Sequence, residues 1–246
     1  VVDDYEQGVT TVIRGEDHIS NTPRQIHIQN ALGYPELEYA HLPLVLGSDK
    51  KRLSKRHAAT SLKEYKELGY LDSAILNTLA RLGWSRGEKE VFYLEDLIKE
   101  FNIKEVQKAG AIFDITKLDF LNSQHMANLD LEEFIDHLKP FLESKDIDVN
   151  SHPKKEILID AMRSSAHNLE GIALNLVCYF HDINEYNQKA VDKFIGSSNE
   201  TLVDLKERLI NLDDWNEDSI DKLLVTYREE KQLSVPKVNQ PLRIAL

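Results

Sequence analysis

The chain has 246 residues, of which 41% are hydrophobic and 29% are charged, and its formal net charge is −12. This composition is typical of a soluble globular protein of one or two domains and excludes an intrinsically disordered chain. No apolar run approaches the roughly 18 residues that a membrane helix requires, and the first residues lack the basic and apolar regions of a signal peptide, so no membrane partner is expected.

The acidic balance is uneven along the chain. Residues 1–120 carry 16 Lys and Arg against 19 Asp and Glu, whereas residues 121–246 carry 14 against 23. This argues against sequence-independent DNA binding, which depends on phosphate neutralisation, but it leaves room for a nucleic acid met by a local basic patch. The single cysteine, Cys178, excludes an internal disulfide and a cysteine-rich metal site and indicates a reducing, cytoplasmic setting. Because Cys178 lies in an apolar run, we expect it to be buried.

The opening part predicts a strand, a helix and a second strand. Residues 8–15 alternate and are rich in β-branched side chains, which favours a strand ending at Gly15. Residues 20–33 have helix-capping candidates at the start and Gly33 at the end. Residues 39–47 read as a second buried strand. This order predicts a parallel βαβ unit, and because two strands cannot bury both faces of such a sheet, we expect part of a larger α/β domain.

From about residue 60 the pattern is helical, with no internal repeat. Two early helices are predicted to end at Gly69 and Gly83, the second capped by Asp72 or Ser73. Pro140 is expected to end or kink its helix. The remaining predicted helices are 93–101, 114–122, 130–142, 154–180, 189–195, 199–212 and 219–230.

The first candidate site is the stretch VIRGEDHI, residues 12–19. Arg14 stands at the end of a predicted strand, where ligands bind in open α/β sheets, and its planar fork suits a carboxylate or a phosphate. Asp17 can accept from ribose hydroxyls or an amine, and His18 can donate to a phosphate or stack on a base. The alternative is a surface arginine paired with Glu16 or Asp17.

The second candidate site is KKRLSKR, residues 50–56, in which five of seven side chains are cationic. A basic loop after a buried strand can close over an anionic ligand and neutralise charge on phosphate oxygens. Ser54 can bond a phosphate or hold the turn, and Leu53 is predicted to anchor the loop on the body of the protein. The alternatives are a solvated basic turn and a nucleic-acid patch without catalysis.

Together the two stretches resemble a known family. VIRGEDHISNTPRQIHIQNALG, then HLPLVLGSDKKRLSKR and GAIFDITKLDFLN, resemble in order and spacing the glutamyl-tRNA synthetases of the class I aminoacyl-tRNA synthetase family. Residues 52–56 are similar to the class I signature KMSKS, position by position. Residues 61–85 and 108–126 are similar to the helical region that follows the signature loop in that family, and the segment QPLRIAL, 240–246, resembles part of its anticodon-binding region.

The resemblance implies a role for each matching residue. It places Arg14 on the carboxylate of the glutamate substrate, and Ser54 and Lys55 at the catalytic loop. The positions that it assigns to ATP are Asp17, His18, Leu44, Val45, Arg52 and Lys55. The implied reaction joins glutamate and ATP into glutamyl-adenylate and pyrophosphate, then transfers the glutamyl group to the 3′ end of tRNA(Glu). Mg²⁺ is expected to accompany ATP, and no structural metal is expected.

The implied fold is mostly α-helical and has three parts. Residues 1–47 would be the last part of a Rossmann-like α/β catalytic domain, residues 48–125 the signature loop and a helical stem-contact region, and residues 126–246 an anticodon-binding helix bundle. The family resemblance also implies a cytoplasmic monomer whose partners are tRNA(Glu), glutamate and ATP.

One expected motif is absent from the sequence. The nine histidines form no H-x-G-H arrangement, the second phosphate-binding signature of the class I fold. We therefore expect an internal piece of a longer synthetase with little activity by itself. The alternatives are a tRNA-binding module without catalysis, a glutaminyl or non-discriminating glutamyl enzyme, and a helical scaffold protein.

Anticodon contacts are not assigned by the sequence. The helix around Arg163 resembles one that carries an arginine where Ser165 stands. Trp215, Tyr227 and Arg228 are candidates for base stacking or phosphate contact, although core packing and solvated faces are the favoured interpretation.

Overall fold

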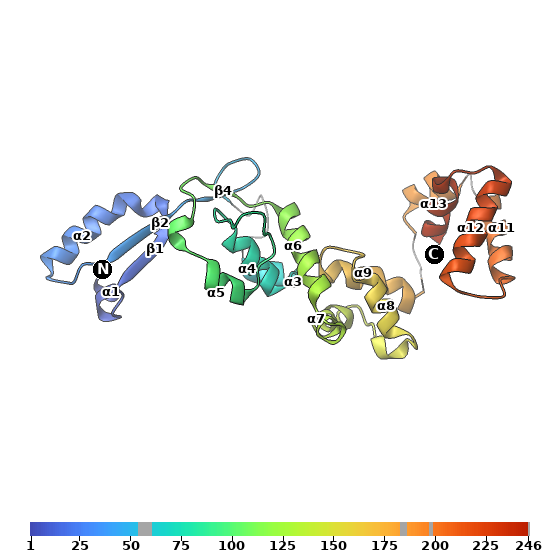
Figure 1. Cartoon of the computed structure of the whole chain (residues 1–246), viewed down its shortest axis with the longest axis horizontal. Helices are drawn as coiled ribbons and strands as arrows, with labels where there is room; N and C mark the ends of the chain where they lie inside the picture. The colour runs from blue at the N-terminus through green and yellow to red at the C-terminus, as the bar shows by residue number, and fades with distance from the viewer. Residues whose placement is uncertain (54–60, 183–185, 197–198, 246) are drawn as a thin grey trace. The chain divides into compact units, whose positions relative to one another are not determined.

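A computed structural model describes residues 1–53, 61–182, 186–196 and 199–245 (Figure 1). The chain divides into two compact units, Val1–Val177 and Cys178–Leu246, which are described separately below. Both are dominated by helices, and among the described residues the strands lie within the first 112 positions. This agrees with the mostly helical fold predicted from the sequence. No helix in the described ranges is both long and apolar enough to cross a membrane.

The first unit opens with the predicted βαβ arrangement. Strand β1 (Thr11–Gly15) pairs in parallel with β2 (Glu38–Leu42), and helix α2 (Thr22–Ala31) connects them. Between β1 and α2 lies a 3₁₀ helix, η1 (Glu16–Asn21), and before β1 lies α1 (Val2–Glu6). The prediction of a parallel unit with its first strand ending at Gly15 is confirmed.

The second predicted strand, 39–47, is two strands. β2 ends at Leu42, and β3 (Val45–Leu46) belongs to a different sheet, where it pairs in parallel with β4 (Ala111–Ile112). Pro43 stands at the break, where a residue without a backbone N–H cannot continue the ladder. The division redirects the chain from the β1–β2 sheet to the helical region.

Four helices follow: α3 (Leu62–Glu67), α4 (Asp72–Ala80), α5 (Leu94–Glu100) and α6 (Ile115–Asn128). A short 3₁₀ helix, η2 (Ile103–Glu105), precedes β4. Two buried clusters hold this region together. One contains Tyr65, Tyr70, Ile75, Phe113 and Leu118, and the other contains Trp84, Phe92 and Leu97.

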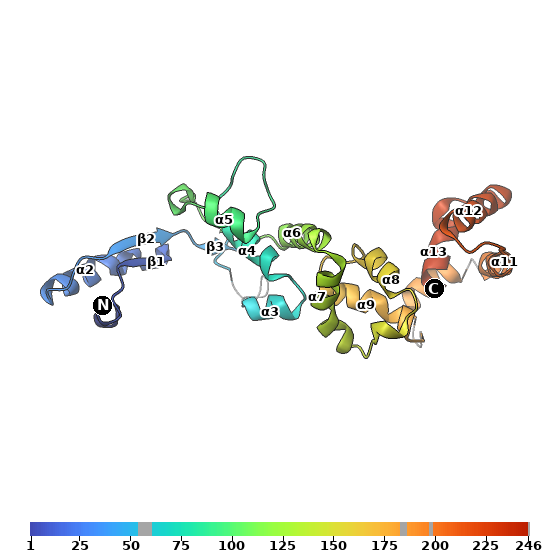
Figure 2. The ribbon, with the colours of Figure 1, turned by 60° about the horizontal axis from the view of Figure 1, so that its bottom comes forward.

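The first unit continues with α7 (Leu131–Glu143), η3 (Val149–Ser151) and α8 (Lys155–Met162). The helix α9 (Leu169–Phe180) follows, and the second unit begins in its last turn. Figures 1 and 2 show the C-terminal end of α6 beside α7 and α9. Buried Phe134, Leu138 and Leu142 line the inner face of α7.

The second unit is a small helical bundle. It contains α10 (Gln188–Ala190), the π-helix η4 (Val191–Ile195), α11 (Asn199–Ile210), α12 (Glu217–Lys231) and α13 (Val235–Ala245). Its core joins one buried residue from each of the last three helices: Leu205, Tyr227 and Val238.

Two local predictions were wrong, and a third is narrowed. Helix α4 is preceded by Leu71, not capped by Asp72 or Ser73, and the Leu71 N–H is satisfied by a distant side chain instead. Helix α7 does not end at Pro140 but continues through it to Glu143, which leaves a kink as the predicted effect of this proline. Cys178 is exposed, because the helical period turns Ile172, Ala173 and Leu176 inward and leaves Cys178 on the opposite face of α9.

Candidate functional site

Arg14, the predicted glutamate-binding residue, lies near the end of β1 with its guanidinium held on the α2 side of the sheet. Its Nε donates to Nε2 of His41, 3.2 Å away, and its Nη2 donates to Oγ1 of Thr22 at 2.7 Å. The register explains the first contact, because Arg14 and His41 are partners in the β1–β2 ladder. The Arg14 guanidinium also lies 5.3 Å from the centre of the Tyr39 ring. Neither Glu16 nor Asp17 is a partner of Arg14, so the predicted alternative pairing was wrong.

Glu16 and Leu44 connect the end of β1 to the segment between β2 and β3. The Leu44 N–H donates to Oε1 of Glu16 at 3.2 Å. Because Leu44 lies just beyond Pro43, where the chain leaves the first sheet, its amide has no ladder partner there and takes a carboxylate instead. The predicted adenine-pocket residue is therefore tied directly to the turn that follows Arg14.

Asp17 and Arg52 form an ion pair between the two stretches singled out in the sequence. Nη1 of Arg52 lies 3.3 Å from Oδ2 of Asp17, and the Arg52 side chain is 71% exposed against 32% for Asp17. Such an exposed pair contributes at most about 1 kcal/mol to stability. Its importance is positional, since it brings the start of the basic loop to the end of β1.

His18 lies on η1 and is exposed. Its ring Nδ1 is 3.3 Å from Nδ2 of Asn21, while its backbone carbonyl accepts from Oγ1 of Thr22 at 3.2 Å. His18 therefore reinforces the same threonine that orients Arg14, and it keeps its imidazole toward solvent.

The basic loop is anchored by its apolar residue, as predicted. The chain reverses after β3, with Lys50 in the left-handed region at φ 62, and the Leu53 N–H donates to the Val45 carbonyl at 2.9 Å. Leu53 and Val45 both pack against the cluster that contains Tyr65 and Phe113. Ser54 and Lys55, the predicted catalytic residues, and Arg56 lie outside the described residues.

The structure thus brings Asp17 to Arg52 and Val45 to Leu53, but it does not bring Arg14 into contact with either carboxylate beside it. Sequence reasoning missed Thr22 and His41, which hold Arg14, and it missed the tie between Glu16 and Leu44. The signal for His41 was available, because aligning the two predicted strands in parallel places the histidine opposite the arginine.

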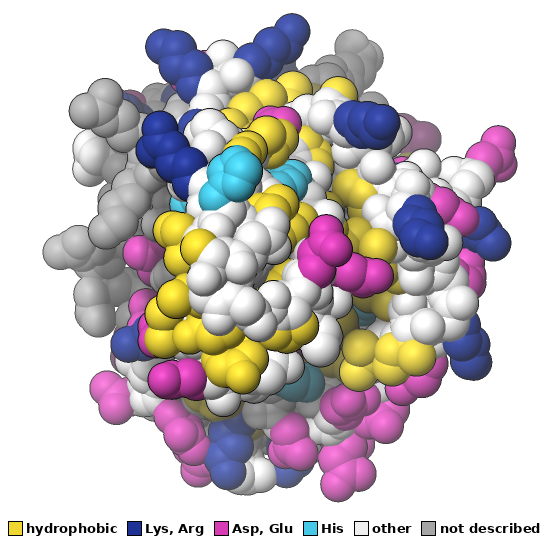
Figure 3. Space-filling view, turned by 90° about the vertical axis from the view of Figure 1, so that its left-hand side faces the viewer, with side chains coloured by type: hydrophobic (Ala, Val, Ile, Leu, Met, Phe, Trp, Pro, Cys, Tyr) yellow, Lys and Arg dark blue, Asp and Glu magenta, His cyan; other side chains and the backbone are white. Residues whose placement is uncertain are grey.

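A cavity of about 800 Å³ lies beside the same strand ends. Its lining includes Ile13, Glu16 and His41 from the first sheet and its turn, with Lys104 and Lys108 from the segment after α5. Figure 3 shows the face of the first unit that carries α1, α2, β1 and β2, where apolar side chains lie among cationic and acidic ones. Ile13 is 55% exposed on this sheet, so part of its apolar face is open.

No group of three or more His, Cys, Asp or Glu side chains suited to a metal ion occurs in the part of the chain that the structure describes.

Two family profiles match the chain. One, described as tRNA synthetases class I (E and Q), catalytic domain, matches residues 1–120. The other, described as an anticodon binding domain, matches residues 133–246. The gap between the two matches falls inside the first compact unit, so part of the second match belongs to the same unit as the first.

Named relatives and solved structures agree with these profiles. The glutamate–tRNA ligase of Thermodesulfovibrio yellowstonii is 41% identical over 254 residues, which cover 100% of this chain and 54% of that protein. The glutamate–tRNA ligase of Geotalea uraniireducens is 40% identical over 247 residues, covering 100% of this chain and 53% of that protein.

A crystal structure of a glutamate–tRNA ligase from Elizabethkingia meningosepticum, in complex with its amino acid, superposes with a TM-score of 0.73. The two sequences are 30% identical. The match covers 100% of this chain and 52% of the chain in that structure. The chain therefore spans about half the length of the relatives it matches. These matches show that residues 1–120 belong to the class I tRNA synthetase (E and Q) catalytic domain and residues 133–246 to an anticodon binding domain.

Proposed function

We propose that this chain is the part of a glutamate–tRNA ligase that carries the signature loop, the stem-contact helices and the anticodon-binding helices. The whole enzyme would activate glutamate with ATP and transfer the glutamyl group to tRNA(Glu). The observation that carries the proposal is the Asp17–Arg52 contact, which joins the turn after β1 to the signature loop at 3.3 Å. Two stretches that the family uses on one substrate are neighbours here.

Arg14 is proposed to bind the glutamate carboxylate. Its hydrogen bonds to His41 and Thr22 use Nε and Nη2, so they fix the plane of the guanidinium while the Nη1 edge takes part in neither bond. A planar fork that is held in advance loses little side-chain entropy when a carboxylate binds. The side chain of glutamate ends in a carboxylate, whereas that of glutamine ends in an amide. Arg14 therefore favours a glutamyl over a glutaminyl substrate.

The proposed ATP site combines the turn, the strand and the loop. Asp17 is suited to the ribose hydroxyls, and His18 lies beside it with its ring in solvent. Arg52 and Lys55 are proposed to neutralise phosphate charge, with Ser54 as a hydrogen-bond donor in the same loop. Leu44 and Val45 are proposed to line the adenine pocket, and Mg²⁺ is proposed to enter on the ATP phosphates.

The helical parts are proposed to bind tRNA(Glu). Residues 1–47, 48–125 and 126–246 keep their predicted roles as catalytic, stem-contact and anticodon-binding parts. Support comes from the match of the anticodon-binding profile to residues 133–246. We also propose that the protein works as a monomer in the cytoplasm, as its resemblance to the family implies, and light scattering would measure the oligomeric state.

The proposal is tested with the 246-residue chain in two binding assays and one exchange assay. Fluorescence titration should show binding of a tRNA(Glu) transcript in preference to an unrelated tRNA, and calorimetry should show binding of a glutamyl-adenylate analogue in preference to the glutaminyl one. Glutamate-dependent exchange of pyrophosphate into ATP should be small, because the histidines form no H-x-G-H motif. Binding of tRNA(Glu) without any binding of the analogue would instead establish a tRNA-binding module, and failure of both would refute the proposal.

A further inference from the structure

Three segments that are far apart in the sequence meet within the first unit, and we call this meeting point the junction: residues 69–71, 119–123 and 167–170. Asn122 lies at its centre and is fully buried. Its Oδ1 accepts from the Leu71 N–H at 2.9 Å, and its Nδ2 donates to the His167 carbonyl at 2.7 Å. One side chain thus bonds the chain before α4 on one side and the chain before α9 on the other.

Gly69 makes the second direct bond across the junction. Its carbonyl accepts from the Leu169 N–H at 2.9 Å. Its φ is +82, and a Cβ atom at this position would stand 2.6 Å from the backbone nitrogen of Glu170 and 2.8 Å from that of Leu169. Backbone therefore packs against backbone here, and any side chain would force the two segments apart.

Side chains around these two residues add further bonds. The Tyr70 hydroxyl donates to Oδ1 of Asp119 at 2.6 Å, and burial together with that carboxylate raises the pKa of Tyr70 above its usual range. Oγ of Ser123 lies 3.2 Å from Nδ1 of His167. A junction in which buried polar groups have partners on both sides has one well-defined geometry.

The junction lies where the two family matches meet. Helices α3 to α6 are on one side of it and α7 to α9 are on the other, and Asn122 falls between the catalytic match, which ends at residue 120, and the anticodon match, which begins at residue 133. We propose that Gly69 and Asn122 are positioning residues that hold the stem-contact helices and the first anticodon-domain helices at a fixed spacing, so that a single tRNA is bound by both. This inference rests on the proposed function.

A fixed spacing has a measurable consequence for affinity. When two binding surfaces are rigidly joined, contact with the first makes contact with the second an intramolecular event, and the gain over either surface alone reaches about 10² to 10⁴. Loosening the junction lowers this gain. It leaves the affinity of each surface for its own part of the tRNA unchanged, because no contacting side chain is altered.

The test compares a whole tRNA(Glu) transcript with two pieces of it, an acceptor-stem minihelix and an anticodon stem-loop, by titration with the 246-residue chain. Gly69→Ala introduces the clash. Asn122→Asp keeps the acceptor for Leu71 but removes the donor to His167. Gly87→Ala is the matched control, because Gly87 also has a positive φ, +58, but no atom within 4 Å of the added Cβ.

We expect both junction variants to bind whole tRNA(Glu) at least about tenfold more weakly while binding each piece as the wild type does. Gly87→Ala should behave as wild type in all three titrations. Unchanged whole-tRNA affinity in both variants would overturn the inference, and so would an equal loss for the whole tRNA and its pieces. It would also be overturned if the wild type bound the whole tRNA no more tightly than one piece. Absence of any tRNA binding by the wild type would instead refute the proposed tRNA-binding role of the helical parts, on which this inference rests.

Discussion

Arg52 reaches Asp17 across 35 positions of sequence, and their side chains meet at 3.3 Å. The pair is exposed, so it holds the loop against the strand end only weakly, and a ligand with phosphate groups can compete for the arginine. The proposed role of Arg52 in ATP binding therefore requires its guanidinium to exchange the Asp17 carboxylate for a phosphate.

Replacing Arg52 with Gln should weaken ATP binding with little effect on stability. A lost charge-assisted hydrogen bond costs about 1.5 to 3 kcal/mol, which corresponds to about tenfold to hundredfold in the dissociation constant. The free energy of unfolding should fall by less than about 1 kcal/mol. Calorimetric titration with ATP and urea denaturation measure the two quantities. Arg24→Gln removes an exposed arginine from α2 as the control, and equal ATP affinity in both variants would contradict the assignment of Arg52.

Replacing Arg14 with Lys should reduce the affinity for a glutamyl-adenylate analogue by about tenfold or more, because an ammonium group cannot form the bidentate contact of a guanidinium. The preference for the glutamyl over the glutaminyl analogue should shrink as well. Thr22→Val removes the bond to Nη2 and should produce a smaller loss in the same direction. If Arg14→Lys retained the wild-type preference, Arg14 would not be the residue that reads the carboxylate.

His125 should make the first unit less stable as the pH falls below about 6.5. The residue is buried, its Nε2 lies 3.1 Å from Oδ1 of Asn77, and its Nδ1 has no hydrogen-bond partner. Burial lowers the pKa of His125, so the folded chain keeps the ring neutral while the unfolded chain takes up a proton. The loss of stability begins near the unfolded pKa and levels off below the lowered pKa of the folded state.

Urea denaturation at a series of pH values between 7.5 and 5 measures this effect. His125→Gln should flatten the decline. His137→Gln is the control, because that ring is exposed. If the free energy of unfolding fell with pH as much in His125→Gln as in the wild type, groups other than His125 would be responsible for the decline.

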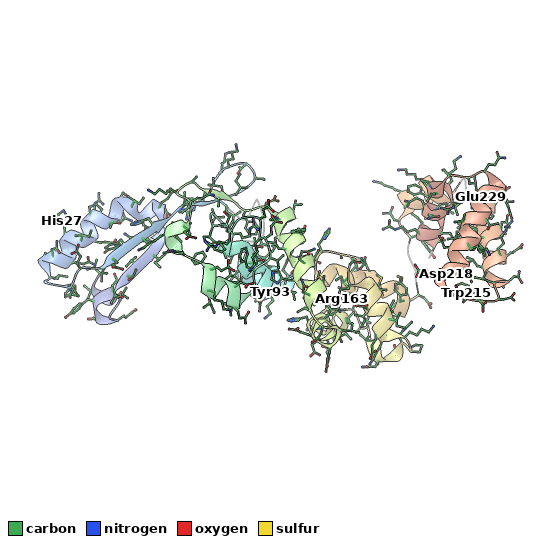
Figure 4. The ribbon with its side chains drawn as sticks, viewed as in Figure 1. His27, Tyr93, Arg163, Trp215, Asp218 and Glu229 are labelled. Carbon is green, nitrogen blue, oxygen red and sulfur yellow. The ribbon has the colours of Figure 1, made fainter. Side chains whose placement is uncertain are left out.

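Tyr227 and Trp215 should differ sharply in their contribution to the second unit. Tyr227 is 2% exposed and has Arg208 at 4.9 Å from its ring centre, whereas Trp215, in the turn between α11 and α12, is 67% exposed (Figure 4). Tyr227→Ala should cost about 3 to 5 kcal/mol, and Trp215→Ala should stay within about 0.5 kcal/mol. Hydrogen exchange of peptides from residues 199–245 measures the change, and peptides from the first unit should remain unaffected.

Short sequence patterns predicted those elements that are determined by residues close together in the sequence. The βαβ unit followed from alternation in residues 8–15 and from Gly33, and Leu53 was recognised as an anchor because it is the apolar residue in a basic run. Pro43 was available as a signal in the same way, but the apolar run around it hid the break between β2 and β3.

The other differences between the sequence predictions and the structure arise from contacts between residues that are far apart in the sequence. Leu71 needs no capping side chain of its own because Asn122, 51 positions away, accepts its N–H. Arg163, considered near the anticodon contacts, donates to the carbonyls of Met126 and Leu129 and is part of the packing between helices. Tyr227 is in the core and Trp215 is on a solvated face, and both agree with the favoured interpretation, although aromatic character alone does not distinguish a buried ring from an exposed one.

The close approach at Gly69 also sets which sequences can be accommodated there. Consider a library that samples every amino acid at positions 69 and 87 and is selected for binding of whole tRNA(Glu). Position 87 should accept Asn and Asp, which tolerate left-handed backbone, because open space surrounds it. Position 69 should accept none of the alternatives, since even the smallest side chain meets two backbone nitrogens. A change of length between Ser61 and Gly69 should be rejected equally, because it would move the Gly69 carbonyl out of register with the Leu169 N–H that donates to it.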